Sequence, residues 1–288
     1  MNTVYLNGEF LPASKAKVSA LDRGFIFGDG VYEVIPAYGG RLFRLDDHLQ
    51  RLNNSLEAIR LDNPLTAAKW SEILNDLVTR NGDGDQSVYL QVTRGVAARD
   101  HVFPADSTPT VFAMSNPLTP PPREWLENGI KAISVDDFRW KYCHIKAITL
   151  LPNILMRQQA LEAGAQEAIL INNDGIVTEG AASNVFIVKD GLLMTPPVEV
   201  SLLPGITRVL ILELAAQHGI PYAEATFGLS DLQSADEIWI SSSTKEIVPV
   251  TELDGKQVGD GKPGQHWHRM LELYQQYKAA LGANLGAE

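Results

Sequence analysis

The sequence predicts an α+β protein of two domains. Strand-like and helix-like segments occur in both halves of the 288-residue chain, but without the strand-helix-strand rhythm of a doubly wound parallel sheet. Residues 117–122 (PLTPPP) cannot form regular helix or a central strand, because proline supplies no amide hydrogen and restricts its predecessor. We therefore expect an N-terminal α+β domain of residues 1–116, a linker of residues 117–122 and a C-terminal domain of residues 123–288.

The expected elements of the first half follow from hydrophobic periodicity. TVYLNGEFLP alternates apolar and polar residues around Asn7-Gly8, which predicts a hairpin. GVYEVIPAYGGRLF is a second strand candidate. Leucine and isoleucine recur three or four residues apart from Leu45 to Ile59, which is the period of an amphipathic helix. AAKWSEILNDLVTRNG predicts another helix, ended by Gly82, and the strands SVYLQVTRG and PTVFAMSN follow.

Beyond the linker, strands and helices alternate irregularly. Helices are expected near residues 150–164, 206–219 and 265–281. The strand candidates are IKAISVDDF, EAILINN, GIVTEG, SNVFIVKDGLLMTPP and EIWISSS. The mixture again favours an α+β architecture.

Composition excludes several classes of partner. A net charge of -11 argues against binding nucleic acid, which needs a clustered basic surface. Cys143 is the single cysteine, so intrachain disulfides and cysteine-rich metal sites are excluded, and His266 and His268 are spaced to face different sides of a helix. Neither a signal peptide nor a long apolar run is evident. We expect a soluble, cytoplasmic protein without a metal, a membrane or a nucleic-acid partner.

Lys146 and Glu179 are candidates for chemistry. Lys146 lies in a mostly apolar run, where an ammonium group tends to lose its proton and become an amine nucleophile; a lysine on the solvent face of an edge strand is the alternative. Glu179 lies in a turn of small residues and could keep a ring nitrogen protonated. An ordinary turn glutamate is the alternative there.

Two polar stretches could bind an anion. Pro204-Gly205 leads into a long helix with Thr207 in its first turn, where free amides and a hydroxyl suit phosphate; a plain helix start is the alternative. Residues 241–244 (SSST) end a strand and could add donors. The glycines of DRGFIFGDGVYEV precede a strand instead of opening a helix, so they do not form a dinucleotide-binding loop.

Residues 94–103 (RGVAARDHVF) concentrate cations in an acidic chain. Arg94, Arg99 and His101 fall within one short polar turn after a strand-like run. The residues by themselves leave open why an acidic chain places this basic cluster here. Arg94 is interpreted only as a cation at a strand end, without an assigned role.

Taken together, these motifs resemble fold-type IV pyridoxal-phosphate enzymes, the class IV aminotransferase family. They occur in the family's order over nearly the whole chain: DRGFIFGDGVYEV, DDHLQRL, VTRGVAARDH, IKAITLLPN, TEGAASNVF, PGITR and SSSTKEIVPV. The resemblance implies a smaller N-terminal α/β sandwich and a larger C-terminal β-barrel-like domain with helices, the latter carrying the Schiff-base lysine. Within the family, Tyr32 combined with RDH is similar to bacterial D-amino-acid aminotransferases.

The resemblance also implies roles for individual residues. Lys146 matches the lysine that forms a Schiff base with the cofactor, pyridoxal 5′-phosphate. Glu179 matches the acid that pairs with the pyridine nitrogen. The residues that match the phosphate ligands are Arg51, Ile206, Thr207 and Ser243. Those that match the group binding the substrate α-carboxylate are Tyr32, Arg99 and His101, a trap that the family completes across a homodimer interface.

The activity implied is ping-pong transamination of D-amino acids with a 2-oxo acid such as 2-oxoglutarate or pyruvate. Aminodeoxychorismate lyase, and an L-branched-chain or amine-specific transaminase of the same fold, are the alternatives; RDH is not expected in the lyase. A non-catalytic, cofactor-binding relative is disfavoured by Lys146. The sequence departs from the family pattern at Ala181 and Ala182, where relatives often carry hydroxyls. Any polar contacts that those hydroxyls make to the cofactor or to water would be missing here.

Overall fold

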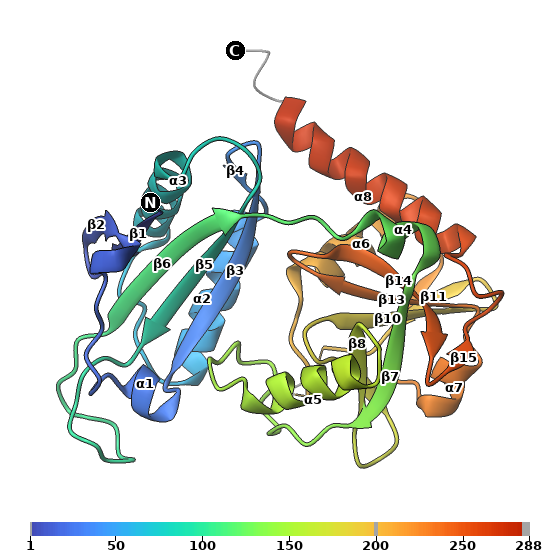
Figure 1. Cartoon of the computed structure of the whole chain (residues 1–288), viewed down its shortest axis with the longest axis horizontal. Coiled ribbons are helices and arrows are strands. Elements are labelled where there is room, and N and C mark those ends of the chain that lie inside the picture. Colours follow the sequence, from blue (N-terminus) through green and yellow to red (C-terminus); the bar gives the residue numbers. More distant parts are fainter. Residues whose placement is uncertain (1, 199–200, 284–288) are drawn as a thin grey trace. The chain divides into compact units, whose positions relative to one another are not determined.

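The computed structural model describes residues 2–198 and 201–283 of the chain, which divides into two compact units. Unit 1 comprises residues 1–119 and 145–150, and unit 2 comprises residues 120–144 and 151–288. Each unit contains one sheet with helices (Figure 1), so the expected α+β class in two parts is confirmed. In the part of the chain that is described, no helix has the length and apolar character needed to cross a bilayer.

Unit 1 is a six-stranded sheet with helices on one face. The strand order is β2-β1-β6-β5-β3-β4, and every neighbouring pair is antiparallel. The elements are β1 (Thr3–Leu6), β2 (Glu9–Pro12), η1 (Ala13–Lys15), α1 (Arg23–Phe27), β3 (Gly30–Tyr38), β4 (Arg41–Leu42), α2 (Leu45–Ala58), α3 (Ala67–Arg80), β5 (Gln86–Thr93) and β6 (Thr110–Pro117).

The core of unit 1 forms where α2 and α3 pack on this sheet. The expected leucine stripe of α2 is buried at Leu52 and Leu56, and it meets Trp70 of α3. Successive residues of a strand point to opposite faces, so Val88 and Leu90 of β5 complete this core. The expected hairpin at Asn7-Gly8, both with positive φ, is confirmed between β1 and β2.

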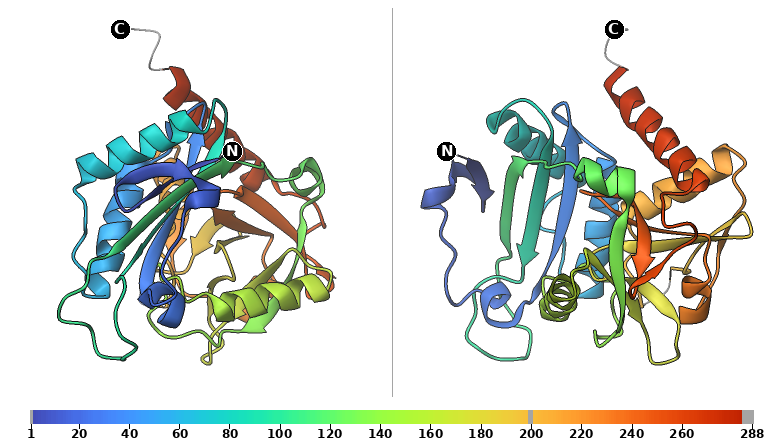
Figure 2. Two further views of the ribbon diagram at one scale, coloured as in Figure 1. Left: turned by 60° about the vertical axis from the view of Figure 1, so that its left-hand side comes forward. Right: turned by 45° about the vertical axis from the view of Figure 1, so that its right-hand side comes forward.

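Unit 2 contains a nine-stranded mixed sheet that curls upon itself (Figure 2). Its strand order is β12-β11-β10-β13-β14-β7-β8-β9, with β15 paired to β14. The elements are α4 (Arg123–Asn128), β7 (Ile130–Asp136), α5 (Leu151–Glu162), β8 (Glu167–Ile171), β9 (Val177–Gly180), β10 (Asn184–Lys189), β11 (Leu192–Thr195), α6 (Ile206–Gln217), β12 (Tyr222–Glu224), α7 (Leu229–Gln233), β13 (Glu237–Ser242), β14 (Glu246–Leu253), β15 (Lys256–Gln257) and α8 (Gln265–Ala283).

Two expected single strands are hairpins in the structure. The first breaks between β3 and β4 at Gly39-Gly40, and the second breaks between β10 and β11 at Asp190-Gly191. All four of these residues have positive φ, a conformation that glycine adopts without steric cost and aspartate tolerates in turns. Gly-Gly and Asp-Gly are both hairpin-turn signals, so the sequence does mark these two turns, and the expectation of single strands is wrong there. The helices expected near 150–164, 206–219 and 265–281 are confirmed as α5, α6 and α8.

The segment that carries Lys146 belongs to unit 1, which differs from its expected place in the C-terminal domain. Residues 145–150 form backbone hydrogen bonds with the start of β3: the Tyr32 amide donates to the Lys146 carbonyl (3.0 Å) and the Ile148 amide donates to the Gly30 carbonyl (3.1 Å). Hydrogen bonds between segments more than a hundred residues apart are not predictable from the spacing of apolar residues within either segment. Of the linker expected at 117–122, Pro117 is the last residue of β6, and residues 118–122 lie between β6 and α4.

Candidate active site

Lys146 and Tyr32 lie in contact in unit 1. The Lys146 Nζ atom is 4.2 Å from the centroid of the Tyr32 ring, which favours a cation above its face. The Tyr32 ring in turn stacks on Tyr89 at 5.7 Å between centroids. The Lys146 amide donates to Ser55 Oγ (3.2 Å) on α2. The main chain of Lys146 is thus anchored on two sides, and its half-buried amine is aligned by an aromatic face.

Arg51 is held by a buried carboxylate that sequence reasoning missed. Arg51 Nε and Nη2 donate to the two oxygens of Glu33, each at 2.8 Å, and His48 Nδ1 lies 2.7 Å from Glu33 Oε2. Burial by itself raises the pKa of Glu33, but the charge and hydrogen bonds of Arg51, assisted by His48, outweigh it and lower the pKa to about 2. Glu33 therefore stays ionised and fixes the guanidinium plane.

A signal for Glu33 was present in the sequence. Residues Tyr32 and Glu33 are adjacent on β3 and therefore point to opposite faces of the sheet. The face of Glu33 is the one covered by α2, where Val31 and Ile35 are fully buried beside it. A carboxylate at an apolar position of a strand requires a cationic partner, and Arg51 on the helix opposite is that partner.

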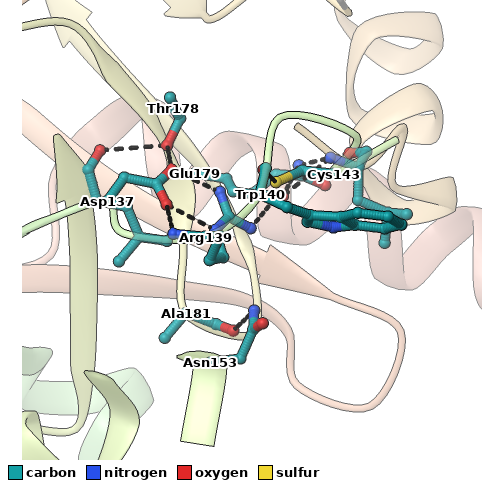
Figure 3. Close-up of polar contacts among 11 residues, drawn as sticks. Asp137, Arg139, Trp140, Cys143, Asn153, Thr178, Glu179 and Ala181 are labelled. Carbon is teal, nitrogen blue, oxygen red and sulfur yellow. Dashed lines mark hydrogen bonds and ion pairs between the residues drawn. The ribbon is translucent and has the colours of Figure 1, made fainter. Parts of the chain in front are cut away.

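In unit 2, Glu179 is the centre of a buried cluster of charged residues (Figure 3). It lies on β9, is only 5% exposed, and accepts a hydrogen bond from Arg139 Nη1. The Leu203 amide (3.2 Å) and Asn184 Nδ2 (3.4 Å) donate to its other oxygen. Arg139 is also bound through two nitrogens to Asp137 (2.9 and 2.8 Å).

The charge of this cluster suits a cation at Glu179. Asp137 and Glu179 share one guanidinium, so the three groups carry one net negative charge when both acids are ionised. Burial raises the pKa of Glu179, and Arg139 opposes that shift without cancelling it. A protonated ring nitrogen would supply the missing positive charge. The residues therefore fit a pyridinium ring, and Arg139 is a site residue that the sequence analysis missed.

Cys143 lies on the same loop as Arg139. Burial raises the pKa of its thiol to about 11, and Sγ donates to the Trp140 carbonyl (3.0 Å), as Figure 3 shows. A thiol with this pKa is neutral at physiological pH and is a poor nucleophile. In unit 2, Cys143 therefore packs beside the acid cluster as a structural residue.

The start of α6 offers backbone amides to an anion. Gly205 is the N-cap and provides no side-chain cap, while Ile206 and Thr207 in the first turn are both buried. A Cβ atom at Gly205 would overlap Asn184 Oδ1, so only glycine allows this close approach. Ser241 Oγ is buried with no partner among the described residues, two residues before Ser243 in the turn after β13. This donor set suits a phosphate.

The two alanines have different environments. Ala181 is buried, and its carbonyl accepts a hydrogen bond from Asn153 Nδ2 (2.9 Å), which holds α5 to the turn after β9 (Figure 3). Ala182 is exposed. Ser183 is the first hydroxyl of this turn, and it donates to the buried Glu167 (3.0 Å). The turn is thus stabilised by a main-chain contact and by the serine that follows the alanines.

Arg99 and His101 are exposed on the loop between β5 and β6. Both contact the ring of Phe27: the Arg99 guanidinium carbon is 5.3 Å from its centroid, and the His101 ring is 5.4 Å away. Tyr32, the third residue expected at the substrate carboxylate, contacts Lys146 and Tyr89. The structure thus brings together Arg99 with His101, and Tyr32 with Lys146, as two pairs.

The candidate groups for chemistry are a half-buried lysine in unit 1 and, in unit 2, a buried acid cluster and the N-terminus of α6. The chain belongs to the class IV aminotransferase family, since residues 30–253 match the family profile, described as Amino-transferase class IV. The D-alanine aminotransferase of Bacillus licheniformis is 45% identical over 261 residues, which cover 91% of this chain and 92% of that protein.

Solved structures agree with this assignment. The Escherichia coli branched-chain amino acid aminotransferase is 30% identical with a TM-score of 0.88, covering 94% of this chain and 92% of that chain. The T.th. branched-chain amino acid aminotransferase, in a structure with pyridoxamine 5′-phosphate, is 26% identical with a TM-score of 0.91, covering 96% of this chain and 93% of that one. The expected family, its fold and its pyridoxal-phosphate cofactor are confirmed.

Proposed function

We propose that the protein transfers the amino group of a D-amino acid, such as D-alanine, to a 2-oxo acid, with pyridoxal 5′-phosphate as its cofactor. The buried cluster of Glu179, Arg139 and Asp137 carries the proposal, because its one net negative charge matches a protonated pyridine nitrogen. The D-alanine aminotransferase of Bacillus licheniformis, 45% identical over most of both chains, supports the choice of D-amino acids.

Each group of the cofactor has its own partner residues in this proposal. Lys146 supplies the amine at the cofactor aldehyde, and Glu179 supplies the acid at the ring nitrogen. Arg51, oriented by Glu33, neutralises phosphate charge. The remaining phosphate donors are Ile206 and Thr207 in the first turn of α6, and Ser243.

Proton movement at Lys146 Nζ is the central step that this chain performs. Pyridoxal phosphate, when bound, supplies an aldehyde that condenses with amines and a ring that accepts the electron pair of the bond broken at Cα. The displaced Lys146 amine removes the Cα proton as a base and later returns a proton as an acid. Glu179 maintains positive charge on the ring nitrogen throughout. Water then releases the carbon skeleton of the donor as one 2-oxo acid, while its amino group would be retained at the site; a different 2-oxo acid takes up that amino group by the reverse steps, so the kinetics are ping-pong.

Tyr32, Arg99 and His101 bind the substrate α-carboxylate in this proposal. A guanidinium binds a carboxylate in a planar, two-pronged fashion, and the imidazole and phenol complete its hydrogen bonding. Holding the carboxylate on one side decides which enantiomer presents its Cα hydrogen to Lys146. We propose that this arrangement selects the D-enantiomer, with 2-oxoglutarate or pyruvate as the second substrate.

We propose that a homodimer completes this trap, with Arg99 and His101 of one copy acting on the cofactor of the other. The exposure of both side chains supports this. The face of the unit 1 sheet opposite α2 and α3 also supports a dimer. It contains a cavity of about 740 Å³ that is lined by apolar residues including Phe112 and Met114, and a second copy could cover such a surface. A cytoplasmic location remains a prediction from the single cysteine.

One assay tests the activity. The purified chain, loaded with pyridoxal phosphate, is incubated with D-alanine and 2-oxoglutarate, and pyruvate formation is followed. Parallel reactions replace D-alanine with L-alanine, L-leucine or aminodeoxychorismate. Pyruvate from D-alanine at a rate at least about a hundredfold above that from L-alanine is expected. Turnover of L-leucine or aminodeoxychorismate without turnover of D-alanine would overturn the proposal.

A further inference from the structure

Asp29 joins two buried arginines in unit 1. Its Oδ2 atom accepts hydrogen bonds from Arg23 Nε and Arg94 Nε, both at 2.8 Å, and its Oδ1 atom accepts one from Arg94 Nη2 (3.1 Å). The arginines are 3% and 4% exposed. Burial alone raises the pKa of Asp29, but Arg94 and Arg23 outweigh it and lower the pKa, so the carboxylate is ionised. We call these three residues the arginine clamp.

The Arg23 end of the clamp binds the loop that carries Arg99 and His101. Arg23 Nη1 donates to the carbonyl oxygens of Asp100 (2.6 Å) and Val102 (3.4 Å), which are the main-chain groups on either side of His101. Asp100 directly follows Arg99 in the chain, so the bond to its carbonyl also restrains the main chain next to Arg99. One guanidinium thus uses Nε to bind Asp29 and Nη1 to bind the loop, which a lysine ammonium is unable to reproduce with the same geometry.

The Arg94 end holds the base of the loop to the rest of unit 1. Arg94 Nη2 donates to the Ile59 carbonyl (2.7 Å) and Nη1 to the Arg60 carbonyl (3.3 Å), at the end of α2. Its guanidinium carbon lies 3.8 Å from the centroid of the Phe103 ring, further along the loop. The clamp therefore includes Arg94, which directly follows β5, and contacts the loop at Asp100, Val102 and Phe103.

An aromatic ring completes the support. Phe27 of α1 contacts the Arg23 guanidinium (4.8 Å to the ring centroid) as well as Arg99 (5.3 Å) and His101 (5.4 Å). Gly95 begins the loop with φ of +90°, and a Cβ there would overlap the Thr108 carbonyl oxygen, so both ends of the loop approach closely. The exposed side chains of Arg99 and His101 thus lie over buried, charged residues.

We propose that Asp29 is a positioning residue for substrate binding: by joining Arg23 to Arg94, it holds residues 99–103 in the conformation in which Arg99 and His101 receive the substrate α-carboxylate. This rests on the proposed function, which assigns the carboxylate to Arg99 and His101. An irregular loop ordered in advance avoids the entropy cost of ordering it at each binding event. The clamp also carries one net positive charge beneath the loop, which attracts an anion.

The test is Asp29→Asn in the full-length, cofactor-loaded enzyme. The amide keeps the size of the side chain but brings a donor toward guanidinium donors, so the clamp loosens. The KM for D-alanine and for the 2-oxo acid is expected to rise about tenfold, with kcat changed less than about twofold and the visible absorbance of the bound cofactor unchanged. Asp47→Asn is the matched control, because Asp47 forms a surface ion pair with Arg44 and is 42% exposed.

A mutant cycle shows whether Asp29 acts through Arg99 and His101. In an Arg99→Ala, His101→Ala background, Asp29→Asn is expected to raise KM by less than about twofold, because both groups that it positions are gone. Equal effects in both backgrounds, or an unchanged KM in Asp29→Asn, would overturn the inference. If instead Arg99→Ala alone leaves KM unchanged, the carboxylate assignment of the proposed function fails, whatever Asp29 does.

Hydrogen exchange provides a readout that is independent of activity. Amides of residues 99–103 are expected to exchange at least about fivefold faster in Asp29→Asn, while amides of β3 and β5 keep their rates. Should Asp29→Asn fail to fold, Arg23→Lys takes its place, since it keeps the charge and loses the two-sided bonding. Unchanged exchange in this loop in the folded variant would contradict the positioning role.

Discussion

Glu33 and Arg51 form a buried, bidentate ion pair with both N–O distances at 2.8 Å. His48 lies at 2.7 Å from the same carboxylate, so a cation and an imidazole share one acid beneath the sheet. In the proposed function Arg51 also faces the cofactor phosphate. The pair therefore links the stability of unit 1 to the strength of cofactor binding.

The stability of the protein is expected to depend on Glu33 in acid. The pKa of Glu33 falls from 4.5 to about 2 on folding, so its stabilising contribution is complete above about pH 4.5 and is lost as the pH falls toward 2. The full shift corresponds to roughly 3 kcal/mol. In Glu33→Gln the free energy of unfolding should therefore fall less steeply as the pH is lowered, as measured by urea unfolding between pH 2 and 6. An acid limb as steep as that of the native chain would contradict the assignment.

Arg139 is expected to set the pH dependence of catalysis. Arg139 lowers the pKa of the buried Glu179, so Arg139→Gln should raise that pKa and move the acid limb of the kcat profile to higher pH. A shift of about one unit or more is expected, since an opposite charge in contact lowers a carboxyl pKa by about 1 to 3 units. Arg80→Gln, which removes an exposed ion pair with Asp76, is the control. If the acid limb of the kcat profile does not move, groups other than Arg139 set the pKa of Glu179.

Lys146→Ala is expected to abolish transamination while the chain stays folded. Loss of a positioned acid and base slows catalysis by about 10² to 10⁴-fold, and loss of the covalent link slows it further. The visible absorbance that native protein shows with pyridoxal phosphate should change, and circular dichroism should not. Lys69→Ala, which removes an exposed ion pair with Glu72 on α3, should leave both signals intact. Native-rate turnover by Lys146→Ala would refute the mechanism.

Gly205→Ala is expected to weaken cofactor binding. The added Cβ would overlap Asn184 Oδ1 and displace the first turn of α6, whose amides are proposed to hold the phosphate. A rise of about tenfold in the dissociation constant of pyridoxal phosphate, measured by absorbance titration, corresponds to roughly 1.4 kcal/mol. Gly164→Ala is the control: its φ of +74° strains alanine, but its Cβ would meet nothing within 4 Å. It should lower Tm without changing cofactor affinity.

The sequence was most informative where the signal is local. Apolar spacing located α2, α3, α5, α6 and α8 within a few residues, because an amphipathic helix buries side chains at a fixed period. The turns at Gly39-Gly40 and Asp190-Gly191 also carry a local signal, since both dipeptides favour hairpin turns, and the expected single strands are wrong because they ran through it. Lys146 and Glu179 were recognisable from their unusual neighbours and from the family resemblance.

By itself, then, the sequence predicted the helices, most of the strands and the family of this protein, and it named Lys146 and Glu179 as candidates for chemistry. Only the tertiary structure decided which charges neutralise one another: Arg139 with Glu179 across 40 positions, and Arg94 with Asp29 across 65. The hydrophobic periodicity of a helix or strand involves residues that are close in the sequence. A buried ion pair forms between residues that folding brings together from distant segments. The partners that orient the candidate site are therefore visible only in the folded chain.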